Sequence, residues 1–528
     1  ERRIRRIAPP LFAMMFSVLL VGAVLMTPED FENTARLLLA QVCFVSNIYL
    51  WQDNGYFAPV ADEYPLLHTW SLSVEEQFYL ILPLLVWVLL VRKSPKLSFS
   101  HLLVMAVIVS FALSVYGAYY HPSATFYLLP TRGWELGIGS CLALVKAGPR
   151  LSRALRELLG VFGLVLILAS ALLYSDETIF PGLAAVLPCI GAALLIYLNQ
   201  DSLSVAGRLL AWKPVVFVGL LSYSFYLWHW PAWVFLDYLN LHEPQWDAKV
   251  WILLGSFGLS YLSWRFVENP FRRKDVFPRP SSLFLAFGVG VCGFFVFVIP
   301  VIYTNGLPRR FSQETIDNLA LNTPVYKQAV KVESIRDGKV PILGADGVEP
   351  SFILWGDSHA LSLAPIVDRM AKERGLSGYL IGDLGRLPVL DVWRHKGKDP
   401  EVTREWVDTS LEYILESDIK NVLLVGRWSL NIHGRMNGDV TTRIMDSETT
   451  LPLNSEKSAQ ALERQLIRTV KKLNEFEHEV WVFMQPPLQH KRITRELFLR
   501  TRIWGGLETL GVSFEDSQKR QEYTLVIM

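Results

Sequence analysis

Long apolar stretches alternate with short polar loops over the first three hundred residues of the chain. Nine of these stretches approach the roughly 17–25 apolar residues that a helix needs to cross a bilayer. The pattern therefore predicts nine membrane spans. They begin near Ile7, Gln77, His101, Arg132, Leu158, Pro181, Pro214, Val250 and Ser282.

The loops between these stretches alternate in charge. Five loops are basic, and the loops between them are acidic or neutral. Because Lys and Arg gather in cytoplasmic loops, the basic set is predicted to face the cytoplasm. The chain then starts inside and leaves the last span outside, near Tyr303. The basic loops are Arg2–Arg6, Arg92–Lys96, Lys146–Arg156, Arg208–Lys213 and Arg265–Arg279.

Residues 36–50 are apolar but short. Counting them as a span would invert the side of every later loop. Their flank, 51–64, contains Asp53, Asp62 and Glu63 and no Lys or Arg. The charge pattern therefore predicts that 36–50 is an interfacial or re-entrant segment on the outer side.

Polar sequence follows Gly306–Arg310, and from Ser351 short apolar strands alternate with amphipathic helices. Such alternation predicts a parallel α/β sheet. The expected organisation is a membrane domain over 1–304, a linker over 305–350 and an α/β domain over 351–528. Strands are predicted at 351–355, 421–425 and 479–484, and helices at 360–374 and 456–475.

Composition supports this division. The chain has 528 residues, 51% of them hydrophobic, and of its 51 Lys and Arg and 50 Asp and Glu, 40 lie in the first 304 residues and 61 in the last 224. A net charge of +1 provides no basic field for nucleic acid. The cysteines lack metal-ligand spacing, so neither a metal site nor a disulfide framework is predicted. They are Cys43, Cys141, Cys189 and Cys292.

Two motifs carry candidate chemistry. In Phe352–Ala360 a short strand enters a Gly-Asp-Ser turn and then a helix, which places Ser358 beside a helix N-terminus whose N–H groups can stabilise an oxyanion. The run Leu67–Tyr79 gathers polar groups before a span on the outer side. An ordinary turn and a solvated membrane boundary are the alternative interpretations. The candidate residues of the second run are His68, Trp70, Glu75 and Glu76.

The Leu67–Tyr79 run resembles the signature loop of acyltransferase family 3, the integral-membrane O-acyltransferases. Arg3–Pro9, Arg132–Gly137 and Leu221–Pro231 resemble three further elements of that family, in the same order. Gly356–His359 resembles the nucleophile turn of SGNH (GDSL-like) hydrolases. The fold class this implies is a multi-span helical membrane bundle followed by an SGNH-like α/β domain with a parallel sheet.

The resemblance also implies roles. Ser358 would be the acyl-enzyme nucleophile, with Gly385 and Asn431 as candidate oxyanion donors, and Glu75 would be a catalytic residue of the membrane site. Arg3 and Arg6 would grip the phosphates of acyl-CoA, although positive-inside anchoring alone also explains these arginines. Further membrane-site candidates are Arg132, Glu135, Tyr223 and His229.

The family has two spans before its Arg-x-x-Arg element, and its SGNH domain carries an Asp-x-x-His near the C-terminus. The sequence starts at Glu1 without the former and shows no Asp-x-x-His in its closing segment. We therefore expect a chain shortened at both ends, which could be an inactive fragment.

The resulting hypothesis is a bacterial inner-membrane O-acyltransferase, with its C-terminal domain on the periplasmic side. Acetyl-CoA would be the donor substrate, with no bound cofactor. The acceptor would be an envelope glycan or lipid-linked saccharide, with lipopolysaccharide O-antigen and peptidoglycan both open. The alternatives are a membrane-anchored O-acetyl esterase and a transporter of glycan intermediates.

Overall fold

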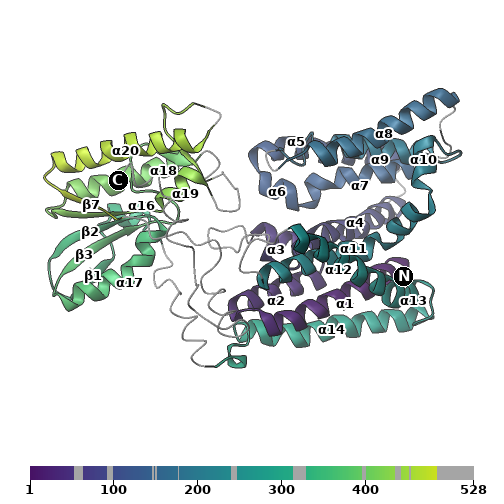
Figure 1. The fold of residues 1–528 in the computed structure, drawn as a ribbon, viewed down its shortest axis with the longest axis horizontal. Coiled ribbons are helices and arrows are strands. Elements are labelled where there is room, and N and C mark those ends of the chain that lie inside the picture. The colour runs from purple at the N-terminus through teal and green to yellow at the C-terminus, as the bar shows by residue number, and fades with distance from the viewer. Residues whose placement is uncertain are drawn as a thin grey trace. The chain divides into compact units, whose positions relative to one another are not determined.

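The computed structural model describes residues 1–52, 63–91, 99–145, 148, 151–175, 178–239, 246–312, 329–394, 400–434, 442–450 and 453–483. The chain forms two compact units, Glu1–Arg310 and Phe311–Met528. The first is helical and the second is an α/β unit (Figure 1). The loop carboxylates Asp53 and Asp62, and the closing segment in which an Asp-x-x-His is expected, lie outside the described residues.

One main helix lies in each of the nine predicted spans. By length and apolar composition, five helical segments of the described residues could cross a membrane: α1, α5, α8, Lys249–Arg272 and α14. The number of crossings stays a prediction. The nine helices are α1 (Arg2–Leu25), α4 (Trp70–Val91), α5 (Phe99–Tyr120), α7 (Leu129–Ala143), α8 (Arg153–Leu173), α9 (Val186–Leu198), α11 (Lys213–Leu239), α12 (Trp246–Ser263) and α14 (Pro280–Tyr303).

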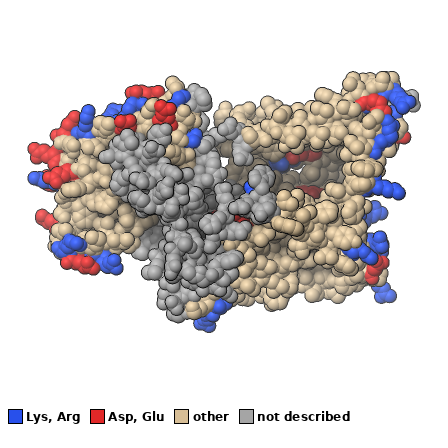
Figure 2. All heavy atoms as spheres, viewed as in Figure 1, with Lys and Arg blue, Asp and Glu red and all other residues tan. Residues whose placement is uncertain are grey.

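Shorter elements connect these helices, and the unit is hollowed between two groups of them. Helices α5 to α10 form one group, and α1, α2 and α11 to α14 form the other (Figure 1). Acidic and basic side chains are visible inside the hollow (Figure 2). The short elements are α6 (Pro122–Tyr127), α10 (Val205–Leu210), α13 (Asn269–Arg272), the 3₁₀ turn η2 (Leu67–Thr69) and the π-helical turn η3 (Trp264–Glu268).

The apolar stretch 36–50 falls in two separate helices, α2 (Pro28–Val42) and α3 (Ser46–Gln52). With 15 and 7 residues, each is shorter than a bilayer crossing. Helix α2 packs against α14, and its buried Asp30 accepts a hydrogen bond from Tyr238 of α11 at 2.9 Å. The interfacial position of this stretch stays a prediction.

A five-stranded sheet in the order β1-β3-β2-β5-β7 forms the centre of the second unit. The pairings among β3, β2, β5 and β7 are parallel, as the sequence predicts, and β1 pairs antiparallel to β3 at the edge. The prediction missed β3, because its six residues between turn glycines show no clear alternation. The strands are β1 (Ile342–Gly344), β2 (Pro350–Gly356), β3 (Ser377–Gly382), β5 (Asn421–Val425) and β7 (Glu479–Phe483).

Helices cover both faces of this sheet. Leu354 of β2 packs with α17 on one face, whereas Ile353 and Trp355 pack with α18 and α20 on the other. Alternate residues of one strand therefore supply two cores. The two predicted helices are confirmed as α17 and α20, and α18 is additional. The helices are α16 (Val332–Arg336), α17 (Ser358–Glu373), α18 (Pro400–Leu415), α19 (Trp428–His433) and α20 (Ser455–Glu475).

The segment predicted as a linker, 305–350, differs from expectation in its second half. Val330 donates its N–H to Gly382 O at 2.8 Å and accepts from Trp406 Nε1 at 3.0 Å. Helix α16 and strand β1 also lie in this segment and pack in the second unit. The α/β unit therefore begins before Ser351. Strand β1 pairs with β3 at the edge of the sheet, and its three residues are too few to be recognised as a strand from the sequence.

A buried carboxylate joins the second, two-stranded sheet to α20. This sheet pairs β4 (Trp393–Arg394) with β6 (Ile444–Met445). Asp446 follows β6 and accepts hydrogen bonds from Arg464 at 2.9 Å, Gln465 at 3.1 Å and Thr449 at 2.5 Å. Burial raises the pKa of Asp446, but these hydrogen bonds outweigh burial and lower it to about 2.

We expect Asp446→Asn to destabilise the second unit near pH 7 by about 1–3 kcal/mol, because it removes a charge-assisted acceptor. The effect should shrink as the pH falls from the ordinary pKa of 3.8 toward about 2, because the wild-type carboxylate then becomes protonated. Hydrogen–deuterium exchange in peptides from α20, compared with wild type at each pH, measures this. An equal difference at pH 2 and pH 7 would contradict it.

Candidate active site

A cavity of about 500 Å³ opens between α1, α4 and α11. It brings together residues from three of the motifs that the sequence analysis singled out, including Arg3, Arg6, Glu75 and Tyr223. Its lining also contains hydroxyl groups that the sequence analysis did not select. The lining residues are Arg2, Arg3, Arg6, Ile7, Ser71, Leu72, Glu75, Ser222, Tyr223 and Tyr226.

Arg3 is the most heavily contacted of the arginines in this lining. Its Nη2 lies 2.9 Å from Glu75 Oε1 and 2.5 Å from Glu76 Oε1, and its Nε donates to Glu76 at 3.2 Å. Its guanidinium carbon lies 3.4 Å from the centre of the Tyr79 ring. Two carboxylates and an aromatic face therefore surround one cation.

This contact differs from the sequence-based placement. The loop charges assign Arg3 to the inner end of the bundle and the Leu67–Tyr79 run to the outer end. In the structure Arg3, the second residue of α1, touches Glu75, the sixth residue of α4. Loop charge indicates the side of a loop but not the depth at which the next helix begins, so only helix packing could reveal this pair.

Two tyrosines of α11 form another wall of the cavity. Tyr223 donates its hydroxyl to Ile7 O of α1 at 2.9 Å. Tyr226 donates to His68 O, and its hydroxyl lies 3.0 Å from Ser71 Oγ. The sequence analysis missed Tyr226 and Ser71. Helical spacing was the available signal, because Tyr226 is three residues after Tyr223 and Ser71 four before Glu75, and such pairs share a helix face.

The two predicted histidines meet beside this wall. The rings of His68 and His229 lie 5.5 Å apart, and the His68 ring lies 5.0 Å from that of Tyr226. His229 Nδ1 is 3.0 Å from Phe225 O, within its own helix. Both ring nitrogens of His68 are buried without a hydrogen-bond partner among the described residues. Neither histidine lines the cavity itself.

Arg132 and Glu135 form a separate cluster on α7. Their predicted pairing at i and i+3 is present, with 3.2 Å between Arg132 Nη1 and Glu135 Oε1. The Arg132 guanidinium faces the Trp70 ring at 5.3 Å and the Phe180 ring at 5.2 Å. Aromatic faces and one carboxylate thus stabilise this cation. The two residues do not line the Arg3 cavity.

In the second unit, the Gly-Asp-Ser turn lies between β2 and α17 as predicted, with Ser358 as the first residue of α17. Asp357 caps the helix by accepting from His359 N at 2.8 Å, and its other oxygen accepts from Arg427 N at 2.8 Å. A side chain at Gly356 would place its Cβ 1.9 Å from Val425 O. These contacts tie the turn to the end of β5.

The two oxyanion candidates follow β3 and β5, the two strands that flank β2 in the sheet. Gly385 follows β3 and adopts a φ of +85°, which glycine tolerates best. Asn431 is buried on α19, where its Nδ2 donates to Arg427 O at 2.8 Å and its Oδ1 accepts from Arg394 at 3.2 Å. Both polar groups of the Asn431 side-chain amide are therefore already hydrogen-bonded within the domain. The oxyanion role of both residues stays a prediction.

Comparison with known families completes the assignment. The sequence profile described as "Acyltransferase domain" matches residues 1–265, half of the chain, and the one described as "SGNH domain (fused to AT3 domains)" matches residues 327–528. The chain belongs to this acyltransferase family. The cavity between α1, α4 and α11 lies in its acyltransferase domain, and Ser358 lies in its SGNH domain.

Three curated relatives are each similar to about half of the chain. The O-acetyltransferase OatA of Staphylococcus aureus is 28% identical over 287 residues, 52% of this chain and 47% of the relative. The peptidoglycan O-acetyltransferase OatA of Listeria monocytogenes is 28% identical over 52% of this chain and 46% of its own. The putative membrane-bound transacylase BcsY of Komagataeibacter xylinus is 31% identical over 51% of this chain and 67% of its own length.

The chain thus spans about half the length of the two OatA relatives that it matches. No solved structure matches the chain.

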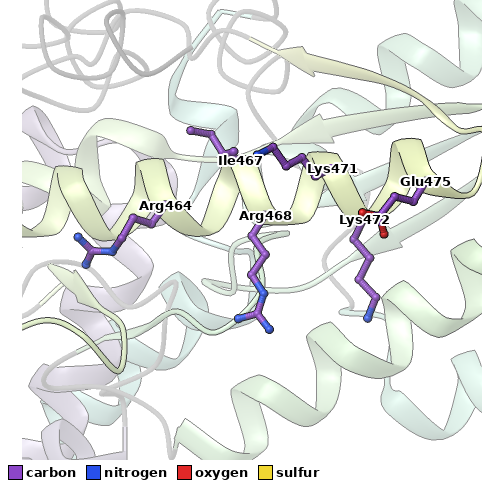
Figure 3. Close-up of a pocket in the computed structure, with 6 residues that line it drawn as sticks. All are labelled: Arg464, Ile467, Arg468, Lys471, Lys472 and Glu475. Carbon is purple, nitrogen blue, oxygen red and sulfur yellow. The ribbon is translucent and has the colours of Figure 1, made fainter.

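The SGNH domain has a second cavity, of about 450 Å³, along α20 (Figure 3). Four of the six side chains that line it are basic. Arg464 pairs with Asp446 at 2.9 Å and Arg468 with Asp391 at 2.7 Å, so two of the four charges already have carboxylate partners. This cavity contains none of the family motifs. We therefore assign the candidate site to the acyltransferase cavity and to Ser358.

We expect Asp357→Ala to destabilise the SGNH domain by about 1–3 kcal/mol, because it removes the cap of α17 and the bond to Arg427 N. Hydrogen–deuterium exchange in peptides from β2, α17 and β5 measures the loss. Ser362→Ala is the control, since Ser362 is exposed and bonds only within α17. A loss equal to that of the control would contradict the linking role of Asp357.

Proposed function

We propose that the chain acts in a bacterial inner-membrane O-acetyltransferase that moves an acetyl group from cytoplasmic acetyl-CoA to hydroxyls of a cell-envelope polysaccharide. Family membership supports acyl transfer, and the names of the OatA relatives support acetyl as the group. The basic loops are proposed to face the cytoplasm, and the SGNH domain the periplasm. The donor and acceptor would then lie on opposite sides of the membrane.

The cavity between α1, α4 and α11 is the observation that carries this proposal. Three arginines lie in its lining beside one carboxylate and several hydroxyl groups. A guanidinium presents paired N–H donors that match phosphate oxygens. Arg3 and Arg6, three residues apart on α1, are therefore proposed to hold the phosphates of acetyl-CoA. Arg132, Glu135, His68 and His229 are proposed to contact the acyl group on its outward path.

Ser358 is the proposed nucleophile of the SGNH domain. Its hydroxyl oxygen would attack the acetyl carbonyl, the bond to the previous carrier would break, the serine proton would pass to the released carrier, and an acetyl-serine ester would form. A sugar hydroxyl would then take the acetyl group, and its proton would return to the serine oxygen. The position of Ser358 at the start of α17 supports this role, because helix N–H groups there favour the developing negative charge.

The acceptor is proposed to be a polymer of the cell envelope. The name of the Listeria monocytogenes relative favours peptidoglycan, and lipopolysaccharide O-antigen is the other candidate. Both present sugar hydroxyls outside the cytoplasmic membrane. The same transfer chemistry would serve either polymer.

We expect deletion of the gene to remove O-acetyl groups from one envelope glycan, with a loss of about 42 Da per group, as acylation at a hydroxyl requires. Complementation with wild type should restore the groups, and complementation with Ser358→Ala should not, because the nucleophilic oxygen is absent. Mass spectrometry of purified peptidoglycan and O-antigen measures the outcome and identifies the acceptor.

Three other results would contradict the proposal in different ways. Full acetylation with Ser358→Ala would exclude the covalent step on this serine. An increase of acetyl groups after deletion would indicate an esterase. No change in any glycan would favour transport of glycan intermediates. Ser362→Ala, four residues along the same helix, is the control for loss of expression.

A further inference from the structure

Arg3, the arginine proposed to bind a donor phosphate, is already paired with carboxylates in the structure. Its Nη2 donates to both Glu75 and Glu76, and its Nε donates to Glu76. A phosphate could therefore reach this edge of the guanidinium only by replacing one of the two carboxylates. The two glutamates are not held equally, and this difference decides which one is replaced.

Glu76 is the more strongly held carboxylate. It contacts Nη2 at 2.5 Å and Nε at 3.2 Å, so it binds two groups of the guanidinium, and its side chain is 18% exposed. Glu75 makes one bond to Nη2 at 2.9 Å and is 40% exposed. Paired contacts to a guanidinium are stronger than single ones, and exposed ion pairs are weak. Breaking the contact of Glu75 with Arg3 therefore costs less free energy than breaking that of Glu76.

The charges that line the cavity also favour entry of an anion. Glu75 lines the cavity, whereas Glu76 does not. Arg2 and Arg6 line it as well, so an anionic group entering beside Arg3 meets further positive charge. The Tyr79 ring, 3.4 Å from the guanidinium carbon, supports Arg3 from its face during the exchange.

We propose that a phosphate group of the acyl donor takes the place of Glu75 on Arg3, while Glu76 stays bound and fixes the orientation of the guanidinium. The inference rests on the proposed function, because it assumes a CoA thioester as the donor. Glu75 competes with the donor in the empty site and is released into the cavity when the donor binds. Glu76 is a positioning residue. Donor binding and release of Glu75 are thus one event.

The released carboxylate has a defined neighbourhood. Ser71, Tyr223 and Tyr226 line the same cavity, and Ser71 lies one turn before Glu75 on α4. Exchange therefore frees the Glu75 carboxylate to contact these hydroxyl groups only after the donor has entered.

Two neighbouring substitutions of the same kind test the exchange. Glu75→Gln removes the competing charge, so binding of CoA to the detergent-solubilised chain should tighten by roughly two- to five-fold, the range for partly exposed ion pairs. Glu76→Gln removes the group that orients Arg3, so binding should weaken by a similar factor. Isothermal titration calorimetry with CoA measures both. Pantetheine, which has no phosphate, should bind both variants and wild type equally.

Several outcomes would overturn the exchange. Weaker CoA binding by Glu75→Gln, or the same change with pantetheine as with CoA, would exclude competition between Glu75 and a phosphate. Misfolding cannot imitate the expected result, because it lowers the number of binding sites and does not tighten the affinity. Failure of wild type to bind CoA at all would instead contradict the proposed donor, and so the proposed function.

Discussion

A guanidinium in an apolar helical bundle needs hydrogen-bond acceptors or aromatic rings around it, and Arg3, whose side chain is 37% exposed, imposes this requirement on the acyltransferase domain. Glu75, Glu76 and Tyr79 of α4 meet it, which joins the start of α1 to α4. Helix α11 joins the same group through Tyr223, which bonds the backbone of α1. These contacts join the three helices that line the cavity.

The SGNH domain depends on a similar constraint at the edge of its sheet. Parallel strands end at one edge, so the turns after β2 and β5 lie close together. Asp357 uses one oxygen to cap α17 and the other to bind Arg427 N after β5. The turn that presents Ser358 is therefore fixed by a contact with another strand. In both domains, one charged side chain joins two elements beside a candidate functional group.

Periodicity and charge predicted the main helices of the acyltransferase domain, the parallel sheet and the turn at Ser358. They missed β3, α18 and β1. Strand β3 lies between turn glycines, and β1 has only three residues, so neither has enough alternating positions to be recognised. Both strands form because a neighbouring strand supplies their hydrogen bonds. Such pairing depends on residues far away in the sequence, which local patterns do not contain.

The sequence by itself identified the residues that carry the candidate chemistry: the arginines of α1, the glutamates of α4, Tyr223 of α11 and the serine after β2. Each motif is a short run of residues, and the spacing within it indicates which residues share a helix face or follow the end of a strand. Only the tertiary structure decided that Arg3 touches Glu75 and Glu76, which loop charges had placed at opposite ends of the bundle. Loop charge responds to the membrane side, whereas the depth and rotation of each helix are set by packing against its neighbours.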